Sequence, residues 1–297
     1  MIIDSHIHLS HFLYNNYFPY LICDKNGYVQ KSDGIRETLI DEMKMSGIGY
    51  VIEPGIDLES NNRSLELSKK HQGFHFSAVG VHPTRSYQYS TVDEQYQKIT
   101  KRLYLRDFKK IEKWANESYV VAIGETGLDY HLERRNQHRL TQKVWFMRQL
   151  ILADKIKKPV VLHIREADHD ALKILRVFKN RLHGGVCHCF CGNEVLAKSY
   201  TTLGLMLGIG ASILQDNCKD LEAAVRQTPL EYILLETDGP YVKPPCPCLS
   251  EKQHRNIRNT SLILPAVVKR IAELKGVSPE EVEYVTTENA IHLFHIT

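Results

Sequence analysis

The chain has 297 residues, of which 43% are hydrophobic and 25% charged, and its formal net charge is +3 at pH 7, which is ordinary for a soluble globular protein. No apolar run is long enough to cross a bilayer and no secretory leader follows Met1, so we expect a cytoplasmic location and no membrane partner. The seven cysteines lack the density of a disulfide scaffold and are expected to be thiols.

Strands and helices are expected to alternate along the chain. Apolar, β-branched runs of strand length occur at residues 2–7, 50–53, 76–81, 120–123, 160–164, 185–189, 205–209 and 232–235. Segments with helical periodicity occur at residues 35–45, 61–70, 105–114, 138–156, 167–178, 194–200 and 221–228. Two further helices are expected after the eighth strand.

This alternation predicts an α/β fold with a parallel sheet. Eight is the number of strands that closes a TIM-like (β/α)8 barrel, and a chain of this length forms such a barrel as one domain, here residues 1–297. A doubly wound open sheet is the alternative, because a sequence does not show closure.

The first strand leads into "DSHIH", which places polar side chains at one end of the predicted barrel. Because side chains two apart in a strand share a face, Asp4, His6 and His8 are expected to point the same way. Two imidazoles on one face at the carboxyl end of a strand form a two-point clamp for a metal ion. The plainer alternative is a pair of polar residues that enter a loop.

Carboxylates and histidines also stand at the ends of later strands. Glu125 follows the fourth strand, His163 and Arg165 share a face of the fifth, and Glu236 and Asp238 alternate inward after the eighth. Each has an ordinary explanation by itself, as a cap, a core histidine or a turn residue. Together they lie at the rim where barrel enzymes form their active sites, and this favours one shared functional site.

The stretch "CHCFC" near the sixth strand allows a thiolate zinc knot, a redox site or a histidine ligand. If Val186 and His188 face inward, Cys187 and Cys189 face outward toward the helices, where buried cysteine acts as a small hydrophobe. The pleat then directs the thiols away from the other candidate ligands. We therefore favour His188 as the ligand, and the position of Cys191 stays open.

Six stretches resemble, in order, the motifs of a known family. They are "DSHIHL", "VGVHPT", "AIGETGLDYH", "PVVLHIREA", "GGVCHCFCG" and "LLETDGPY". Over nearly the whole chain the sequence resembles the TatD family of metal-dependent deoxyribonucleases, within the amidohydrolase superfamily. The resemblance implies a TIM-like barrel, a divalent metal site and 3′–5′ exonuclease or phosphodiester hydrolase activity on DNA, although many members are assigned only as hydrolases.

The resemblance also implies a ligand set for two divalent ions. Its members are His6, His8, Glu125, His163, His188 and Asp238. His6 and His8 would hold one ion, and His163 and His188 would hold the second. Glu125 would bridge the two ions. Asp238 would also bind the first ion and orient the attacking water. Four imidazoles and two carboxylates suit zinc first, with manganese, iron, nickel or magnesium as alternatives.

Three further positions match family residues that face the substrate. His82 in "GVHP" matches a position near the phosphate, and Arg165 and Arg258 match basic positions. His82 could equally be a capped loop histidine. Asp4 and Glu236 stand two residues before ligands and are candidates to accept hydrogen bonds from metal-binding imidazoles.

The implied chemistry is hydrolysis of a phosphodiester. Two ions could activate a water and polarise the phosphoryl oxygen. The predicted catalytic carboxylates are Glu125, which bridges the ions, and Asp238, which would accept the proton and later help to protonate the leaving oxygen. The expected partner is DNA or another phosphodiester, and no obligate protein partner is evident.

The chain departs from the family pattern in an insert at about residues 13–34, between the first strand and the first helix. The insert carries the aromatic residues Tyr14, Tyr17, Phe18, Tyr20 and Tyr28, and its Asn-Gly pair is typical of a tight hairpin. One hypothesis is a lid whose rings stack on nucleobases. The alternative is that the rings pack on the barrel or on a partner subunit.

Two more departures lie after the eighth strand. Cys246 and Cys248 occur in a Pro-rich loop and are expected to be free thiols, because a disulfide between them would close a very short, strained loop; an extra metal ligand is the alternative. "RNTS" stands where the family commonly has Arg-Asn followed by an acid and proline. These differences leave the ligand positions intact and bear on substrate preference.

Two other functions remain open. A barrel with the same metals could hydrolyse a small amide, ester or lactone, because a fold does not fix a function. A non-catalytic metal-binding protein is the second alternative, but all six ligand positions are intact.

Overall fold

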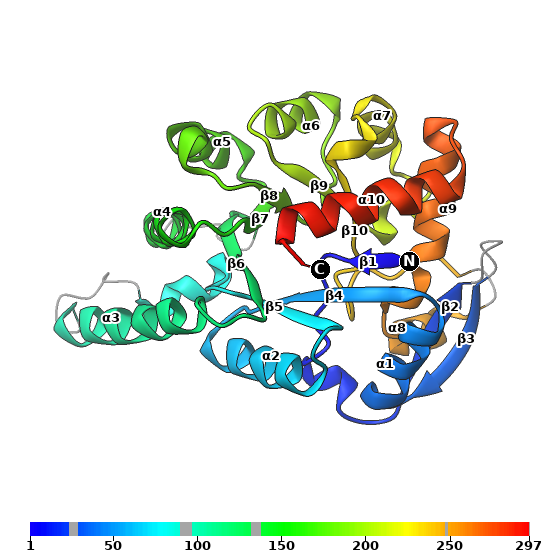
Figure 1. Cartoon of the computed structure of the whole chain (residues 1–297), viewed down its shortest axis with the longest axis horizontal. Helices are drawn as coiled ribbons and strands as arrows, with labels where there is room; N and C mark the ends of the chain where they lie inside the picture. The colour runs from blue at the N-terminus through cyan, green and yellow to red at the C-terminus, as the bar shows by residue number, and fades with distance from the viewer. Residues whose placement is uncertain (24–28, 90–96, 132–137, 247–248, 297) are drawn as a thin grey trace.

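The computed structural model describes residues 1–23, 29–89, 97–131, 138–246 and 249–296. Its centre is an eight-stranded parallel sheet that curls into a nearly closed, TIM-like barrel (Figure 1). The strands are β1 (Ile2–Asp4), β4 (Ile48–Pro54), β5 (His75–Val79), β6 (Val120–Asp129), β7 (Val160–Arg165), β8 (Gly185–Cys187), β9 (Met206–Ile209) and β10 (Ile233–Leu235). Each pairs with the next barrel strand along the chain, as predicted.

The seam between β1 and β10 decides between a barrel and an open sheet. The Ser5 N–H donates to the carbonyl of Leu235 at 2.9 Å, and the His8 N–H donates to the carbonyl of Gly239 at 2.8 Å. Ile7 and Gly239 also form a parallel bridge. The doubly wound open sheet, which would leave its outer strands unpaired, is therefore wrong.

Alternation along the strands separates two hydrophobic clusters. Val186 packs with Ile3 and Leu234 in the cluster inside the barrel, whereas Cys187 belongs to the larger cluster between the strands and the helices. This confirms the predicted orientation of these two residues. Parallel strands that are buried on both faces read as continuous apolar runs, which is why their positions are visible in the sequence.

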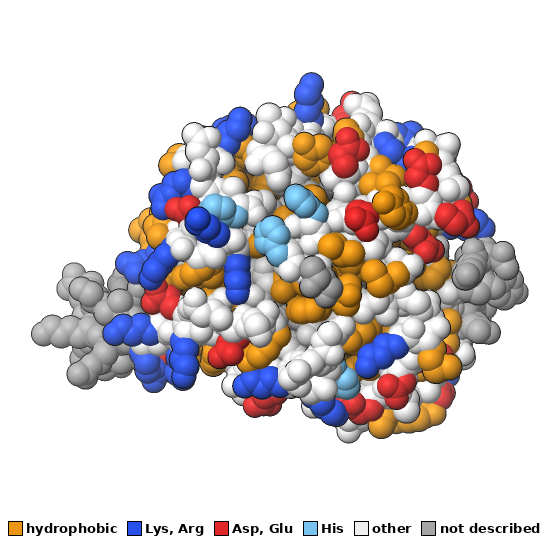
Figure 2. All heavy atoms as spheres, viewed as in Figure 1, with side chains coloured by type: hydrophobic (Ala, Val, Ile, Leu, Met, Phe, Trp, Pro, Cys, Tyr) orange, Lys and Arg blue, Asp and Glu red, His pale blue; other side chains and the backbone are white. Residues whose placement is uncertain are grey.

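Helices surround the barrel, and the last one closes its amino-terminal end. They are α1 (Arg36–Met45), α2 (Leu58–Lys70), α3 (Gln97–Trp114), α4 (Arg139–Ile156), α5 (Asp168–Phe178), α6 (Glu194–Thr201), α7 (Lys219–Gln227), α8 (Glu251–Asn256), α9 (Leu264–Lys275) and α10 (Pro279–Phe294). Figure 1 shows α10 lying across this end of the barrel. Leu293 and Phe294 of α10 join the cluster inside the barrel. Seen from this end, the surface mixes basic, acidic and hydrophobic side chains (Figure 2).

Some element bounds differ from the prediction. In the described part of the chain three helices follow β10 rather than two, because the short α8 has only six residues and carries little periodicity. β1 ends at Asp4 and β8 at Cys187, so His6, His8 and His188 lie just beyond their strands. None of the helices in the described ranges has both the length and the apolar character that a membrane crossing needs.

The insert forms an antiparallel hairpin of β2 (Phe18–Cys23) and β3 (Val29–Gly34). The Asn26-Gly27 pair and Tyr28 lie outside the described residues. Tyr14, Phe18 and Tyr20 are buried. These rings therefore pack on the barrel, and among the described rings of the insert only Tyr17, which is 69% exposed, remains available for the lid that we considered.

Asp4 ties the seam together from inside. Its Oδ1 accepts the backbone N–H groups of His6 at 3.2 Å and Thr237 at 3.1 Å, and its Oδ2 accepts the hydroxyls of Thr237 at 2.7 Å and Ser261 at 2.6 Å. Burial raises the pKa of Asp4 to about 7, against the lowering effect of these hydrogen bonds. The expectation that Asp4 accepts from a metal-binding imidazole is wrong, because its oxygens are engaged by the seam.

We expect Asp4→Ala to lower the free energy of unfolding by about 2–4 kcal/mol, because buried donors on both sides of the seam lose their acceptor. Asp4→Asn keeps one oxygen for the two backbone N–H groups and offers an amide to the two hydroxyls, so its loss should be clearly smaller. Urea denaturation of the three proteins measures both differences. Equal losses in the two variants would contradict this account of the seam.

The raised pKa of Asp4 also predicts a pH dependence. The folded chain holds the proton up to about pH 7, whereas the ordinary value is 3.8, so the contribution of Asp4 is full below pH 3.8 and is lost as the pH rises through 7. Asn resembles the neutral form at every pH. The stability of the wild type relative to Asp4→Asn should therefore fall between pH 4 and pH 7 in paired urea titrations, and a constant difference would refute the raised pKa.

Candidate metal centre

His6, His8 and Asp238 meet at the carboxyl end of the barrel strands. The Nε2 atoms of the two histidines are 3.3 Å apart. Asp238 Oδ1 lies 3.6 Å from Nε2 of His6 and 3.5 Å from Nε2 of His8. Glu125 Oε2 lies 3.7 and 3.9 Å from the same two nitrogens. Ligand-type atoms from β6 and from the segments that follow β1 and β10 therefore face a common point.

The other carboxylate oxygen of Glu125 faces a second group. Its Oε1 lies 2.9 Å from His163 Nδ1 and 2.9 Å from His188 Nε2. These two nitrogens are 3.0 Å apart, and His82 Nε2 lies 3.4 Å from the same oxygen. Glu125 is thus shared between two sets of imidazoles, one on each of its oxygens.

The donor atoms fit a divalent metal ion. Ligands at 2.0–2.1 Å from a tetrahedral ion lie about 3.3–3.4 Å from one another. The separations of 3.3–3.6 Å among His6, His8 and Asp238 agree with this spacing. These three residues form one group whose ligand atoms all lie within 4.8 Å of one another, and His82, Glu125 and His163 form another.

The electrostatics of the site centre on the Glu125 carboxylate. Burial by itself would raise the pKa of Glu125, but the neighbouring imidazoles of His82 and His188 hold it well below its ordinary value. In return, Glu125 raises the pKa of His188 well above its usual range, although burial opposes this. Burial, followed by the nearby His188, lowers the pKa of His6 well below its usual value. The buried Glu125 carboxylate therefore favours the charged form of His188, whereas burial favours the neutral form of His6.

Asp129 fixes the ring of His163, and the sequence analysis missed it. Its Oδ2 lies 3.0 Å from His163 Nε2, which leaves Nδ1 to face Glu125. Gly127 between the two acids has φ 143°, and a Cβ there would lie 2.0 Å from the His163 carbonyl oxygen. The signal was present, because Glu125, Gly127 and Asp129 alternate along "GETGLD" and place both acids on one face.

His82 lies at the centre of the site. Its Nδ1 accepts the Thr84 N–H at 3.1 Å, so the neutral ring carries its proton on Nε2, which faces Glu125. Burial lowers the pKa of His82, followed in effect by the nearby His163. The ring therefore caps its own loop through Nδ1, as the alternative had it, and also directs a neutral Nε2–H donor toward Glu125.

Glu236 lies beside His188, as the spacing suggested. Glu236 Oε2 and His188 Nδ1 are 3.6 Å apart, and both are buried atoms without a hydrogen-bond partner. Burial raises the pKa of Glu236, and the nearby His188 opposes that effect. The two atoms face each other, and a small shift of either side chain would bring them within hydrogen-bond distance. That hydrogen bond would hold the His188 ring with Nε2 toward Glu125.

The two arginines named from the sequence lie in different settings. Arg165 is exposed at the end of β7, and its carbonyl accepts the N–H of Tyr130. Arg258 is half-buried, and its guanidinium donates to the carbonyls of Asn256 at 3.0 Å and Ile257 at 3.4 Å. Arg165 thus lies at the rim with its side chain exposed, where it can meet a ligand, whereas Arg258 is engaged by its own backbone.

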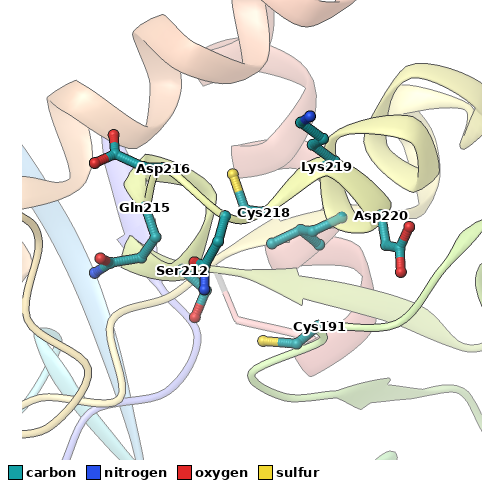
Figure 3. Close-up of a pocket in the computed structure, with 9 residues that line it drawn as sticks. Cys191, Ser212, Gln215, Asp216, Cys218, Lys219 and Asp220 are labelled. Carbon is teal, nitrogen blue, oxygen red and sulfur yellow. The ribbon is translucent and has the colours of Figure 1, made fainter.

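The cysteines take no part in the candidate metal groups of the described residues. The pleat ends at Cys187, so the predicted outward orientation does not extend to the half-buried Cys189, whose φ is 46°. Cys191 is exposed and lines a separate cavity of about 690 Å³ with Ser212 and Cys218 (Figure 3). A hydrogen bond from Cys189 lowers the pKa of Cys191 to about 7. Cys248 lies outside the described residues, so the proposed state of the Cys246–Cys248 pair is not described.

Glu53 is a second residue that the sequence analysis missed. It ends β4 and is buried, and its Oε1 accepts both the N–H of Ser10 at 2.9 Å and the Ser10 hydroxyl at 2.5 Å. His75 Nε2 lies 2.8 Å from its other oxygen. These bonds hold the loop two residues after His8. The signal was again a carboxylate at the end of a barrel strand.

Comparisons with known proteins agree with this geometry. A family model described as TatD related DNase matches residues 3–295. An uncharacterized metal-dependent hydrolase of Bacillus subtilis, YabD, is 28% identical over 296 residues and covers 100% of both chains. The protein named 3′-5′ ssDNA/RNA exonuclease TatD of Cronobacter sakazakii is 31% identical over 263 residues, which are 88% of this chain and 92% of that relative.

A solved structure shares the fold. The TatD homologue YjjV of Escherichia coli K12 superposes with a TM-score of 0.76 at 22% identity, and the match covers 100% of this chain and 98% of that one. The barrel, the clustered donors at its carboxyl end and the family match over nearly the whole length point the same way. This chain is a metal-dependent hydrolase that belongs to the TatD-related DNase family.

Proposed function

We propose that the protein is a divalent-metal-dependent phosphodiester hydrolase that removes nucleotides from the 3′ end of DNA. The observation that carries the proposal is the division of the Glu125 carboxylate, one oxygen toward His6 and His8 and the other toward His163 and His188. This is the arrangement that a carboxylate bridging two ions needs. The exonuclease name of the relative from Cronobacter sakazakii supports the choice of substrate.

The ligands in this proposal are those implied by the sequence. They are His6, His8, Glu125, His163, His188 and Asp238. Their imidazole-rich composition favours zinc over a metal that prefers only oxygen ligands. When bound, two such ions would supply Lewis acidity at the phosphoryl oxygen and a water of lowered pKa.

Asp238 is the better general base of the two central carboxylates. Glu125 is 3% exposed, and its surrounding imidazoles keep its pKa well below the ordinary value, so it holds its charge and does not take up a proton. The side chain of Asp238 is 16% exposed and has Oδ1 at the edge of the histidine pair. It can accept the proton of the attacking water and return it to the leaving oxygen.

His82 would act on the phosphate. Its neutral ring has Nδ1 occupied by the Thr84 N–H, so Nε2–H is the only donor that it offers to the site. A phosphoryl oxygen next to Glu125 would accept this hydrogen bond as negative charge builds on it. Arg165 at the end of β7 would add positive charge along the bound strand.

We expect Asp238→Asn to lower the turnover of a phosphodiester about 10²–10⁴-fold, because the variant loses its proton acceptor. Initial rates on a 3′-labelled oligodeoxynucleotide measure the effect, with metal content determined in parallel. Asp216→Asn, which changes an exposed carboxylate near the other cavity, is the matched control and should leave the rate unchanged. An Asp238→Asn variant that keeps its metal and cleaves at the wild-type rate would show that Asp238 is not the base.

Metal removal should abolish activity and weaken the fold. We expect two ions per chain by elemental analysis, loss of nuclease activity after chelation, and a lower Tm for the chelated protein, because an ion that binds only the folded chain stabilises it. His163→Asn should reduce the bound metal, whereas His169→Asn should not, since that side chain is 80% exposed. Full activity in chelator would exclude the metal mechanism, and cleavage of N-acyl substrates alone would favour the amidohydrolase alternative.

A further inference from the structure

A cavity of about 400 Å³ opens beside the candidate metal centre. His8 forms one wall, and His11, Phe12, Arg85 and Tyr241 form others. Its volume is in the range of sites that take a small molecule, such as one nucleotide. Since His8 belongs to both the cavity and the cluster, a ligand in the cavity would lie next to the reacting phosphate.

Aromatic rings line this cavity and remain open to solvent. Phe12 is 65% exposed and Tyr241 is 42% exposed. The Tyr241 ring centroid lies 6.1 Å from that of His8 and 5.5 Å from that of His11, and the Phe12 centroid lies 4.3 Å from that of His11. Large rings are costly to expose to water, and at the mouth of a cavity they form a surface on which a flat base can stack.

Hydrogen bonds orient the tyrosine. Burial lowers the pKa of His11 to about 4, so its ring is neutral near pH 7. Its Nδ1 accepts the Leu13 N–H at 3.2 Å, which places the ring proton on Nε2, 3.0 Å from the Tyr241 hydroxyl. The Tyr241 oxygen accepts a hydrogen bond from this Nε2–H, and its own O–H is left to donate to a ligand.

The loop after His8, which carries His11 and Phe12, is held in place before any ligand arrives. The Nε of Arg36 donates to the carbonyl of Leu9 at 2.7 Å, and its guanidinium reaches the carbonyl of His11 at 3.3 Å. Ser10 is bound by Glu53 from the other side. A preformed loop pays little ordering cost on binding, which suits a recognition site.

Arg85 supplies positive charge to the same cavity. Its side chain is 51% exposed, and its Nε lies 3.8 Å from Asp57 Oδ2, which is too long for a hydrogen bond. Asp57 is engaged at the start of α2, where its Oδ1 accepts the N–H of Ser60 at 2.9 Å. The other two acids of the wall also have partners, Glu53 in Ser10 and Glu59 in Arg63. Arg85 is held only by its long ion pair with Asp57 among the described residues, and its exposed guanidinium can reach an anion in the cavity.

We propose that this cavity holds the nucleotide adjacent to the cleaved bond, with its base stacked on Tyr241 and Phe12 and its flanking phosphate bound by Arg85. The proposal rests on the proposed phosphodiesterase function. It gives the protein a preference for a phosphodiester with a base on that side, without a strong preference among bases, because every base offers a flat face.

Matched oligodeoxynucleotides test the stacking surface. One has all its bases, and the others carry a single abasic position at the 3′-terminal or at the penultimate nucleotide. For the wild type, kcat/KM on one of the two abasic substrates should be about 5-fold to 100-fold lower than on the oligonucleotide that has all its bases. Tyr241→Ala should erase this difference, Tyr241→Phe should keep it, and Tyr284→Ala, which removes a 68% exposed ring from α10, is the control that should change nothing.

The phosphate contact has its own test. Replacing the phosphate that flanks the cleaved bond by an uncharged methylphosphonate should slow the wild type, and Arg85→Ala should show no such sensitivity. If the wild type cleaves DNA but Tyr241→Ala, with its metal intact, slows every substrate by the same factor, the subsite is refuted while the nuclease function stands. A wild type that cleaves no oligonucleotide refutes both.

Discussion

The structure depends on one constraint, which is that the buried Glu125 carboxylate must be balanced by positive charge. A lone carboxylate in the mouth of a barrel would take up a proton rather than bear the desolvation cost. Here imidazoles face both of its oxygens and hold its pKa well below the ordinary value. Every barrel strand that contributes to the site points its carboxyl end toward this charge. The barrel fold, which brings these ends to one rim, is what makes the balance possible.

The second layer of the site decides which atom each imidazole presents. Asp129 lies at the outer nitrogen of His163, Thr84 occupies one nitrogen of His82, and Glu236 faces the outer nitrogen of His188. Each partner leaves one nitrogen pointing into the cluster. A site that binds cations needs the lone pairs of its ligands aimed before the ion arrives, and Asp129 and Glu236 face the outer nitrogens of the two imidazoles, His163 and His188, for which this matters. His82 differs, because the Thr84 N–H on Nδ1 leaves it with an Nε2–H donor.

The loops around the rim have different roles, since one packs against the barrel and another exposes aromatic rings near the site. The hairpin insert packs its rings into the barrel wall and bonds the Tyr14 hydroxyl to the carbonyl of Asn259, so it braces the segment after β10 rather than covering the site. The short loop after His8 instead leaves Phe12 exposed beside Tyr241. The aromatic surface suited to a base is therefore formed by two separate segments, the loop after His8 and the segment after β10, whereas the described rings Tyr14, Phe18 and Tyr20 of the insert are structural.

The sequence by itself determined the eight strands, their parallel order and the presence of His, Glu and Asp residues at their carboxyl ends, because apolar runs and strand alternation are local properties. Tertiary structure alone decided the rest. Asp4 shares its spacing with His6 and His8, yet the seam with Thr237 and Ser261 engages its carboxylate. Residues from different strands and loops also form the other contacts. His163 pairs with Asp129, Glu53 bonds Ser10, and Tyr14 and Tyr20 are buried against the barrel. Such pairs depend on which chain segments the closed barrel brings together, and no local pattern records that.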